Sequence, residues 1–170
     1  MTLSEFNALS PAMAQARLMD CCGCERWAAI VTAQRPFADA NALFDAADHQ
    51  WRNLGRAEWL EAFSHHPQIG EKATRGSESH RVWAAGEQSG SRDAAEDVKT
   101  RLVRGNRTYF DKFGFIYIVC ATGKSAEEML ALLEDRLHND PVRELQIAAE
   151  QQRQITRLRL QKLLAGEQTL

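Results

Sequence analysis

The stretch SAEEMLALLEDRLHNDPVRELQIAAEQQRQITRLRLQKLLAG, residues 125–166, contains the clearest helix boundaries in the chain. Ser125 and Glu128 have the spacing of a capping box, which begins a helix. Pro141 begins a second helix, because proline is favoured in the first helical turn, and Gly166 ends it. Apolar residues share broad faces of that second helix. The stretch therefore predicts two helices in succession and indicates an α-helical fold.

The same kinds of start and stop signals divide the rest of the chain. Ser10-Pro11 is a strong helix start. Glycine then separates several segments, and Pro67 disfavours helical backbone at the residue before it. The helices expected from these signals are 11–20, 25–33, 38–53, 56–65, 79–89, 92–112, 125–138 and 141–165.

One run differs from this helical background. Residues 115–121, FIYIVCA, are strongly β-prone, but no partner strand is apparent elsewhere. We therefore expect either a buried extended segment or a short helix, and not a sheet. The prediction is an all-α single domain, residues 1–170, of about eight helices.

Composition and charge narrow the class of protein. Of the 170 residues, 44% are hydrophobic and 26% charged, and the formal net charge is −2, so nucleic acid and anionic membrane are not expected partners. No apolar run approaches the roughly 20 residues that a membrane span needs. We expect a cytoplasmic protein, because neither a secretory signal nor a peroxisomal ending is visible.

Three of the four cysteines crowd into positions 21, 22 and 24, which is a poor disulfide framework. Cys21 and Cys24 form a Cys-x-x-Cys, so a thiol oxidoreductase is one alternative. A zinc site would need a second such pair, and none exists. The preferred interpretation is reduced thiols at a helix end, with no metal site.

His66 is the strongest candidate for chemistry among the five histidines. It lies immediately before Pro67, where a helix has to stop, so its backbone is held extended and its ring can point into a pocket. His65 is expected on the helix itself. The alternative is a non-catalytic helical interaction module, in which His66-Pro67 is only a helix end.

Two further pairs of polar residues are ambiguous from the sequence alone. Glu87 and Gln88 either form a solvated helix face or line a site with His66. Arg157 and Arg159 are two positions apart, so they point in different directions and only one faces the interior. Spacing does not decide which.

Taken in order, these motifs resemble the family of 2-oxo-4-hydroxy-4-carboxy-5-ureidoimidazoline (OHCU) decarboxylases. The resemblance covers nearly the whole chain. Its motifs are His66-Pro67-Gln68-Ile69-Gly70, Glu87-Gln88, Asn106-x-x-Tyr109-x-x-Lys112-Phe113-Gly114-Phe115, Cys120-Ala121-x-Gly123-Lys124-Ser125, Arg136-Leu137-x-Asn139, Glu144-Leu145 and Ile155-Thr156-x-Leu158-Arg159-Leu160.

The resemblance implies a homodimeric, cofactor-independent, all-α decarboxylase that forms (S)-allantoin in the last step of urate breakdown. His66 matches the catalytic histidine and Glu87 its acidic partner. Pro67, Gln88 and Arg159 match substrate-contacting positions. Ala84 stands where the family commonly has serine, so one hydroxyl contact to the substrate is missing or replaced.

The residues also suggest a mechanism. Loss of CO2 would push electrons into the ring C=N bond of the substrate, so no cofactor is expected. His66 would hydrogen-bond or deprotonate the substrate hydroxyl, and Glu87 would stabilise the imidazolium. Backbone groups of Phe115, Ile116, Tyr117, Ile118 and Val119 would complete the pocket, since an extended segment leaves its amides free. A different ureide or hydantoin substrate remains a third alternative.

Overall fold

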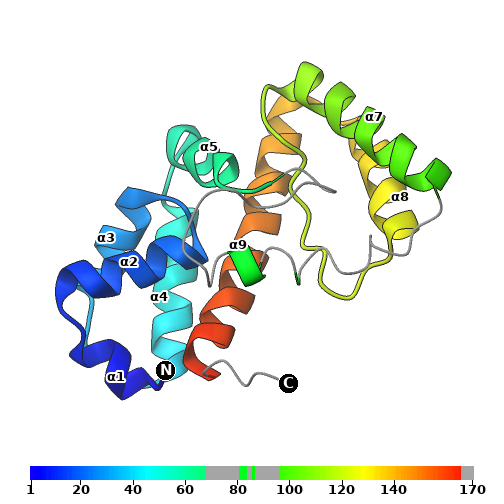
Figure 1. Ribbon diagram of the computed structural model, residues 1–170. Helices are drawn as coiled ribbons and strands as arrows, with labels where there is room; N and C mark the ends of the chain where they lie inside the picture. Colours follow the sequence, from blue (N-terminus) through cyan, green and yellow to red (C-terminus); the bar gives the residue numbers. More distant parts are fainter. Residues whose placement is uncertain (68–80, 84–85, 87–95, 166–170) are drawn as a thin grey trace. The chain divides into compact units, whose positions relative to one another are not determined.

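The computed structural model describes residues 1–67, 81–83, 86 and 96–165, and every regular element within them is a helix (Figure 1). The all-α prediction is confirmed. The helices are α1 (Leu3–Ala8), α2 (Pro11–Cys21), α3 (Glu25–Ala33), α4 (Ala40–Arg52), α5 (Arg56–Ser64), α7 (Glu96–Phe113), α8 (Ala126–Arg136) and α9 (Pro141–Ala165).

These residues group into two compact units. The first unit is Met1–Ala62 with Arg153–Leu170, and the second is Phe63–Gln152. Helix α9 contributes to both units. The prediction of a single domain stays a prediction, and each unit is described below by itself.

The predicted helix signals account for most of the first unit. The Ser10 hydroxyl accepts a hydrogen bond from the Met13 amide, with Pro11 in the first turn of α2, as expected. Helix α4 begins two residues later than predicted, because the Asp39 carboxylate caps it by accepting from the Ala42 amide. Helix α1 was not predicted, although Thr2 and Glu5 form a capping box.

Helix α3 packs against both α2 and α4 in this unit. Trp27 of α3 is fully buried, and its indole Nε1 donates to the Ala47 carbonyl of α4 at 3.0 Å. Asp48 of α4 binds Arg153 and Arg157, with oxygen–nitrogen distances of 2.6 and 3.0 Å. The apolar core therefore carries a charged cluster at its edge, between α4 and α9.

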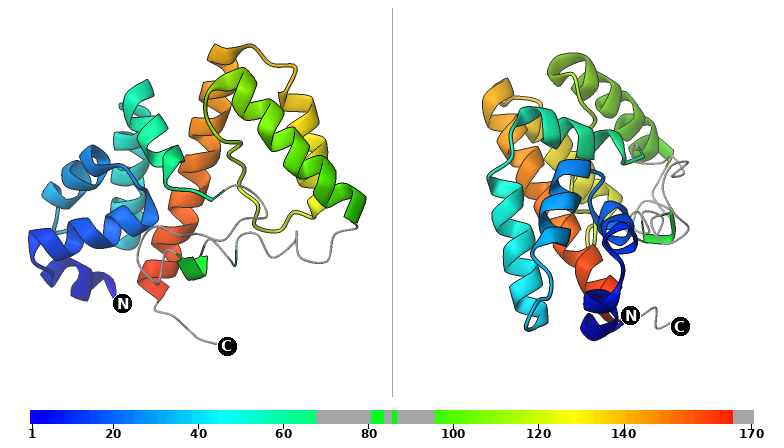
Figure 2. Two further views of the ribbon diagram at one scale, coloured as in Figure 1. Left: turned by 45° about the horizontal axis from the view of Figure 1, so that its top comes forward. Right: turned by 90° about the vertical axis from the view of Figure 1, so that its left-hand side faces the viewer.

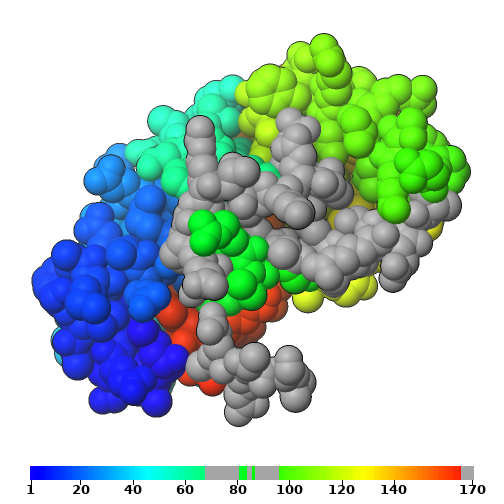
Figure 3. All heavy atoms as spheres, viewed as in Figure 1, coloured from blue at the N-terminus to red at the C-terminus, as the bar shows by residue number. Residues whose placement is uncertain are grey.

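In the second unit α7 packs along α8. A Cβ added at Gly105 of α7 would lie only 2.6 Å from Cδ2 of Leu133 on α8, so the absence of a side chain permits this close approach. Gly114, at φ +77°, ends α7 as predicted, and its amide donates to the Phe110 carbonyl. The outer side of α7 lies at the surface in the space-filling view (Figure 3).

Residues 115–121 form neither helix nor strand and run as an open trace from α7 toward α8 (Figure 2). Of the two predicted alternatives, the structure has the buried non-helical segment. Most of its side chains are buried, and Phe115 and Tyr117 belong to an aromatic cluster around Tyr109. None of the described helices is both long and apolar enough to cross a membrane.

Candidate functional site

The end of α5 carries the candidate histidine. The helix ends at Ser64, and the His66 amide donates to the Phe63 carbonyl at 3.1 Å, closing a turn before Pro67. The prediction that the helix stops at or before His66 is confirmed. His65 lies in this turn and not on the helix, which corrects the sequence prediction, because the helix already ends one residue earlier.

The His66 ring is held by a residue of α9. Its Nε2 lies 2.7 Å from Oε1 of Gln152, whose side chain is fully buried. Gln152 was not among the predicted site residues. Its place on the interior face of the 141–165 helix was visible in the sequence, but the contact spans 86 residues of chain and has no local signal.

The segment 115–121 is tied to the same stretch of α9. The Cys120 amide donates to Oε1 of Gln151 at 2.9 Å, so neighbouring glutamines hold this segment and His66. The Phe63 and Phe115 rings also meet, with centroids 5.4 Å apart. The turn after α5 and the segment after α7 therefore converge on one region of the second unit.

The hydrogen-bonding groups of this segment differ in whether they have partners within the described residues. Arg136 Nη1 donates to the Ile118 carbonyl at 2.8 Å, and the Tyr117 hydroxyl donates to the Met129 carbonyl at 3.2 Å. In the described part of the chain, the amide N–H groups of residues 115–119 have no acceptor. Within that part of the chain, the segment is fixed through the Tyr117 side chain and the Ile118 carbonyl, and its amides remain available as donors to a ligand rich in oxygen atoms.

A buried polar network supports the segment from behind. The Glu144 carboxylate, fully buried, accepts from Arg136 at 2.5 and 2.8 Å and from Asn139 at 2.8 Å. The Tyr109 hydroxyl donates to the same carboxylate. Burial raises the pKa of the Tyr109 hydroxyl, and burial also raises the pKa of Tyr117 to about 12, so both stay protonated donors.

Arg136 keeps its charge inside this network. Burial alone would lower its pKa, but the hydrogen bonds to Glu144 more than compensate, and the pKa is raised above its usual value. The guanidinium also stacks 4.7 Å from the Tyr117 ring centroid. The cation therefore holds both the backbone and a side chain of the segment.

The arginine ambiguity is resolved by burial. Arg159 is 1% exposed, whereas the Arg157 side chain is 34% exposed, binds Asp48 and lies 5.2 Å from the Phe44 ring centroid. Arg159 is thus the inward arginine, in the first unit, while His66 is in the second. Ala84, Glu87 and Gln88 lie outside the described residues.

The cysteines do not resemble a redox site. All four are free and buried. Burial raises the pKa of the Cys22 thiol, and burial raises the pKa of Cys24 to about 11. Reactive thiols need the opposite shift. Within the described residues, no group of three His, Cys, Asp or Glu side chains is placed to hold a metal ion.

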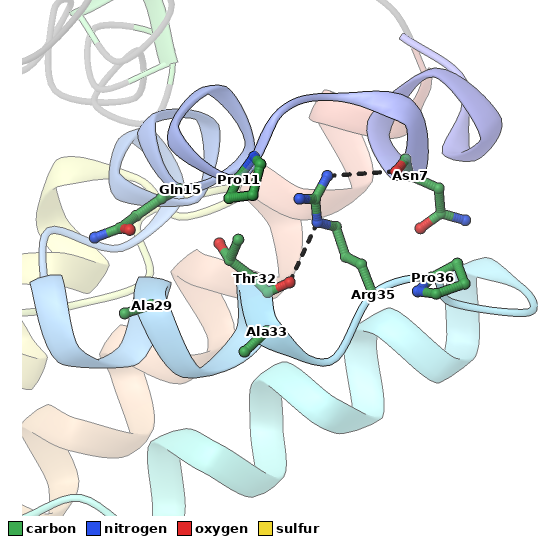
Figure 4. A pocket seen from close by; sticks show the side chains of 8 residues that line it. All are labelled: Asn7, Pro11, Gln15, Ala29, Thr32, Ala33, Arg35 and Pro36. Atoms are coloured by element: carbon green, nitrogen blue, oxygen red, sulfur yellow. Dashed lines mark hydrogen bonds between the residues drawn. The ribbon is translucent and has the colours of Figure 1, made fainter.

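A separate open hollow of about 510 Å³ lies in the first unit (Figure 4). Arg35 donates there to the carbonyls of Phe6, Leu9 and Thr32 at 2.9, 2.8 and 3.2 Å, so its charge is taken up by the ends of α1 and α3. None of the predicted site residues lines it. The lining residues are Asn7, Pro11, Gln15, Ala29, Thr32, Ala33, Arg35 and Pro36.

A helical chain with a histidine held by a buried amide, and a segment whose backbone amides have no acceptor among the described residues, is a protein equipped for acid–base chemistry on a polar ligand. A family model described as OHCU decarboxylase matches residues 7–161. The chain belongs to the OHCU decarboxylase family. The resemblance seen in the motifs is confirmed.

Individual relatives agree with this assignment. A bifunctional uric acid degradation protein of Arabidopsis thaliana is 35% identical over 149 residues, which are 86% of this chain and 46% of that protein. The 2-oxo-4-hydroxy-4-carboxy-5-ureidoimidazoline decarboxylase of Amia calva is 31% identical over 142 residues, covering 83% of this chain and 81% of that one. The chain thus spans about half of the plant relative and most of the Amia calva relative.

A solved structure is similar to this chain, and the similarity extends over nearly the whole length of that structure. It is described as OHCU decarboxylase in the presence of (S)-allantoin and has 35% sequence identity and a TM-score of 0.77. The match covers 89% of this chain and 99% of that one.

Proposed function

We propose that this chain removes CO2 from 2-oxo-4-hydroxy-4-carboxy-5-ureidoimidazoline and forms (S)-allantoin, the last step from urate to allantoin. Family membership supports the reaction class. The observation that carries the proposal is local: neighbouring glutamines, Gln151 and Gln152, hold the Cys120 amide and the His66 ring, and the amides of residues 115–119 have no acceptor within the described chain. An ionised, oxygen-rich substrate requires a group that carries protons and backbone amides that donate to its oxygen atoms.

The chemistry needs no electron sink from the protein. As the carboxylate leaves as CO2, its bonding electrons form a C=C bond between the hydroxyl-bearing and the ureido-bearing carbons. The ring C=N bond accepts the displaced pair, and its nitrogen takes a proton. Protonation of the ureido-bearing carbon on one face and loss of the hydroxyl proton then give (S)-allantoin.

His66 is the proposed proton carrier in this sequence. Its ordinary pKa range lies near working pH, so the ring can accept the hydroxyl proton and return one without a large energetic cost. The donors of residues 115–119 would stabilise oxygen atoms on which negative charge develops. Because these donors are fixed in place before the substrate arrives, they need no reorganisation during the reaction.

The remaining roles follow the family pattern. Glu87 would stabilise the imidazolium and Gln88 would bind the amide-rich ring. Pro67 fixes the turn that carries His66. Arg159, always charged, would orient the ureido group or a carboxylate, and with Ala84 one hydroxyl contact to the substrate would be missing or replaced.

The decisive test replaces His66 with alanine and follows chirality. Substrate decays in solution to both enantiomers, so the assay must measure the excess of (S)-allantoin formed from fresh substrate. His66→Ala should lower the enzymatic rate by roughly 10²- to 10⁴-fold while the helical circular dichroism is kept. His65→Ala is the matched control and should keep the rate. Full activity in His66→Ala would overturn the mechanism.

Two further properties are proposed, of which the first rests on the resemblance. We propose a homodimer, which sedimentation equilibrium of the purified protein would measure directly. We propose a cytoplasmic location, which cell fractionation would test. A different ureide or hydantoin substrate would be recognised by turnover without (S)-allantoin as product.

A further inference from the structure

We infer that Gln152 is a positioning residue that sets the tautomer of His66, with the proton on Nε2 and the lone pair of the neutral ring on Nδ1. The inference deepens the proposed function and rests on the catalytic role given there to His66. It assigns the fixing of the ring to Gln152 and leaves to Glu87 the stabilisation of the imidazolium.

The geometry sets the direction of the hydrogen bond. The atom that faces Nε2 at 2.7 Å is the amide oxygen of Gln152, and a carbonyl oxygen only accepts. The shared proton therefore resides on Nε2. In a neutral imidazole the other nitrogen then carries no proton and is the one that can take one.

The position of Gln152 makes this preference strong. Its side chain is fully buried on α9, so water does not compete for its oxygen. A buried amide costs free energy unless it is hydrogen-bonded, and a shift of the ring proton from Nε2 to Nδ1 would leave this oxygen facing a second acceptor. Both effects oppose the Nδ1–H tautomer.

A neutral amide also differs from a carboxylate in the same place. A carboxylate would hold the proton more firmly and favour the charged imidazolium. The amide orients the ring without adding a charge beside it. Gln152 thus fixes the geometry of His66 while leaving its ring free to be neutral.

The first measurement reads the tautomer directly, without activity. Nitrogen-15 NMR of histidine-labelled protein at a pH where the ring is neutral distinguishes Nε2–H from Nδ1–H, and the signal missing in His66→Gln identifies the residue. The wild type should show His66 as Nε2–H. An Nδ1–H signal would mean that the amide is turned the other way, and it would overturn the inference.

Three variants then separate positioning from packing. Gln152→Met keeps the length of the side chain and loses the acceptor. Gln152→Glu keeps an acceptor at the same reach. Gln146→Met places the same new side chain at an exposed position of the same helix and is the matched control.

The expected pattern is specific. Gln152→Met should lose the single tautomer and lower kcat by about 10- to 100-fold, with KM nearly unchanged, because a residue that only positions the ring adds nothing to substrate binding. Gln152→Glu should keep Nε2–H, and Gln146→Met should change nothing. If Gln152→Met retains both the tautomer and kcat, the inference is wrong. If Gln152→Met does not fold, the tautomer of His66 in the wild type and in Gln152→Glu still tests the inference.

Failure of the proposed function would look different. If neither the wild type nor any variant forms an excess of (S)-allantoin, the reaction assigned above is wrong. The NMR comparison of wild type, Gln152→Glu and Gln152→Met would still show whether Gln152 sets the His66 tautomer.

Discussion

Two polar regions of the second unit differ in whether their hydrogen-bonding groups have partners within the described chain. Around Glu144, a fully buried carboxylate accepts from Arg136, Asn139 and Tyr109, so the carboxylate is satisfied by three partners. Around His66, the ring is half-buried, and the amides of residues 115–119 have no acceptor in the described chain. We call the Glu144 region closed, because its polar groups bind one another, and the His66 region open, because its amides have no acceptor among the described residues.

The difference separates support from function. A polar group that is satisfied within the protein supports the fold, whereas a backbone donor without a protein acceptor is available to a ligand. Arg136 connects the two regions, because it binds both Glu144 and the Ile118 carbonyl. The closed network therefore anchors the backbone at Ile118, inside the segment that carries the open donors.

The largest expected effect comes from opening the closed region. Glu144→Ala would leave the buried Arg136 guanidinium without its carboxylate, which should destabilise the fold by about 3–5 kcal/mol. Urea denaturation followed by circular dichroism measures this loss. A loss below 1 kcal/mol would show that the network contributes little to stability.

Glu134→Ala is the matched control, since Glu134 pairs with Arg101 at 2.6 Å while both side chains are about half exposed. Water already solvates such a pair, so its removal should cost at most about 1 kcal/mol. Equal losses in the two variants would contradict the distinction between a closed and an open region.

An intermediate effect is expected in the open region when a ligand is supplied. Amide hydrogen exchange of residues 116–119 should slow on addition of (S)-allantoin, because the ligand provides oxygen acceptors for these donors. The Cys120 amide, which already donates to Gln151, is the internal control and should change little. NMR-detected exchange with and without ligand resolves these positions.

Exchange that is unaffected by (S)-allantoin, or amides 116–119 as protected as Cys120 before any ligand is added, would remove the reason for calling this region open. Addition of (R)-allantoin tests stereoselectivity at the same positions, with weaker protection expected.

The helices were predictable where their causes are local. Ser10 with Pro11, Ser125 with Glu128, and Gly114 each act within one turn, and the structure has the corresponding caps. Helix α1 was missed although its own capping box is just as local. Residues 115–121 could not be settled, because β-prone side chains become a strand only if a partner strand exists.

The site was predictable to the extent that chain geometry constrains it. Pro67 marked His66 because of its effect on the preceding residue. Gln152 escaped notice, because its partner is far along the chain. Arg157 and Arg159 were equivalent by spacing, and they are separated by the burial of Arg159 and the pairing of Arg157 with Asp48.

The smallest expected effect concerns the cysteines, which are all buried. With a pKa of about 11, Cys24 is a thiolate in only about one molecule in a thousand at pH 8, and thiolate is the reactive form. Iodoacetamide at pH 8 should therefore leave Cys21, Cys22 and Cys24 unmodified and the activity unchanged, as intact-mass spectrometry would show. The same treatment in urea should modify all four cysteines, including Cys120. Rapid alkylation of native Cys21 or Cys24 would contradict their burial and would favour the thiol oxidoreductase alternative, since that chemistry needs an exposed thiolate.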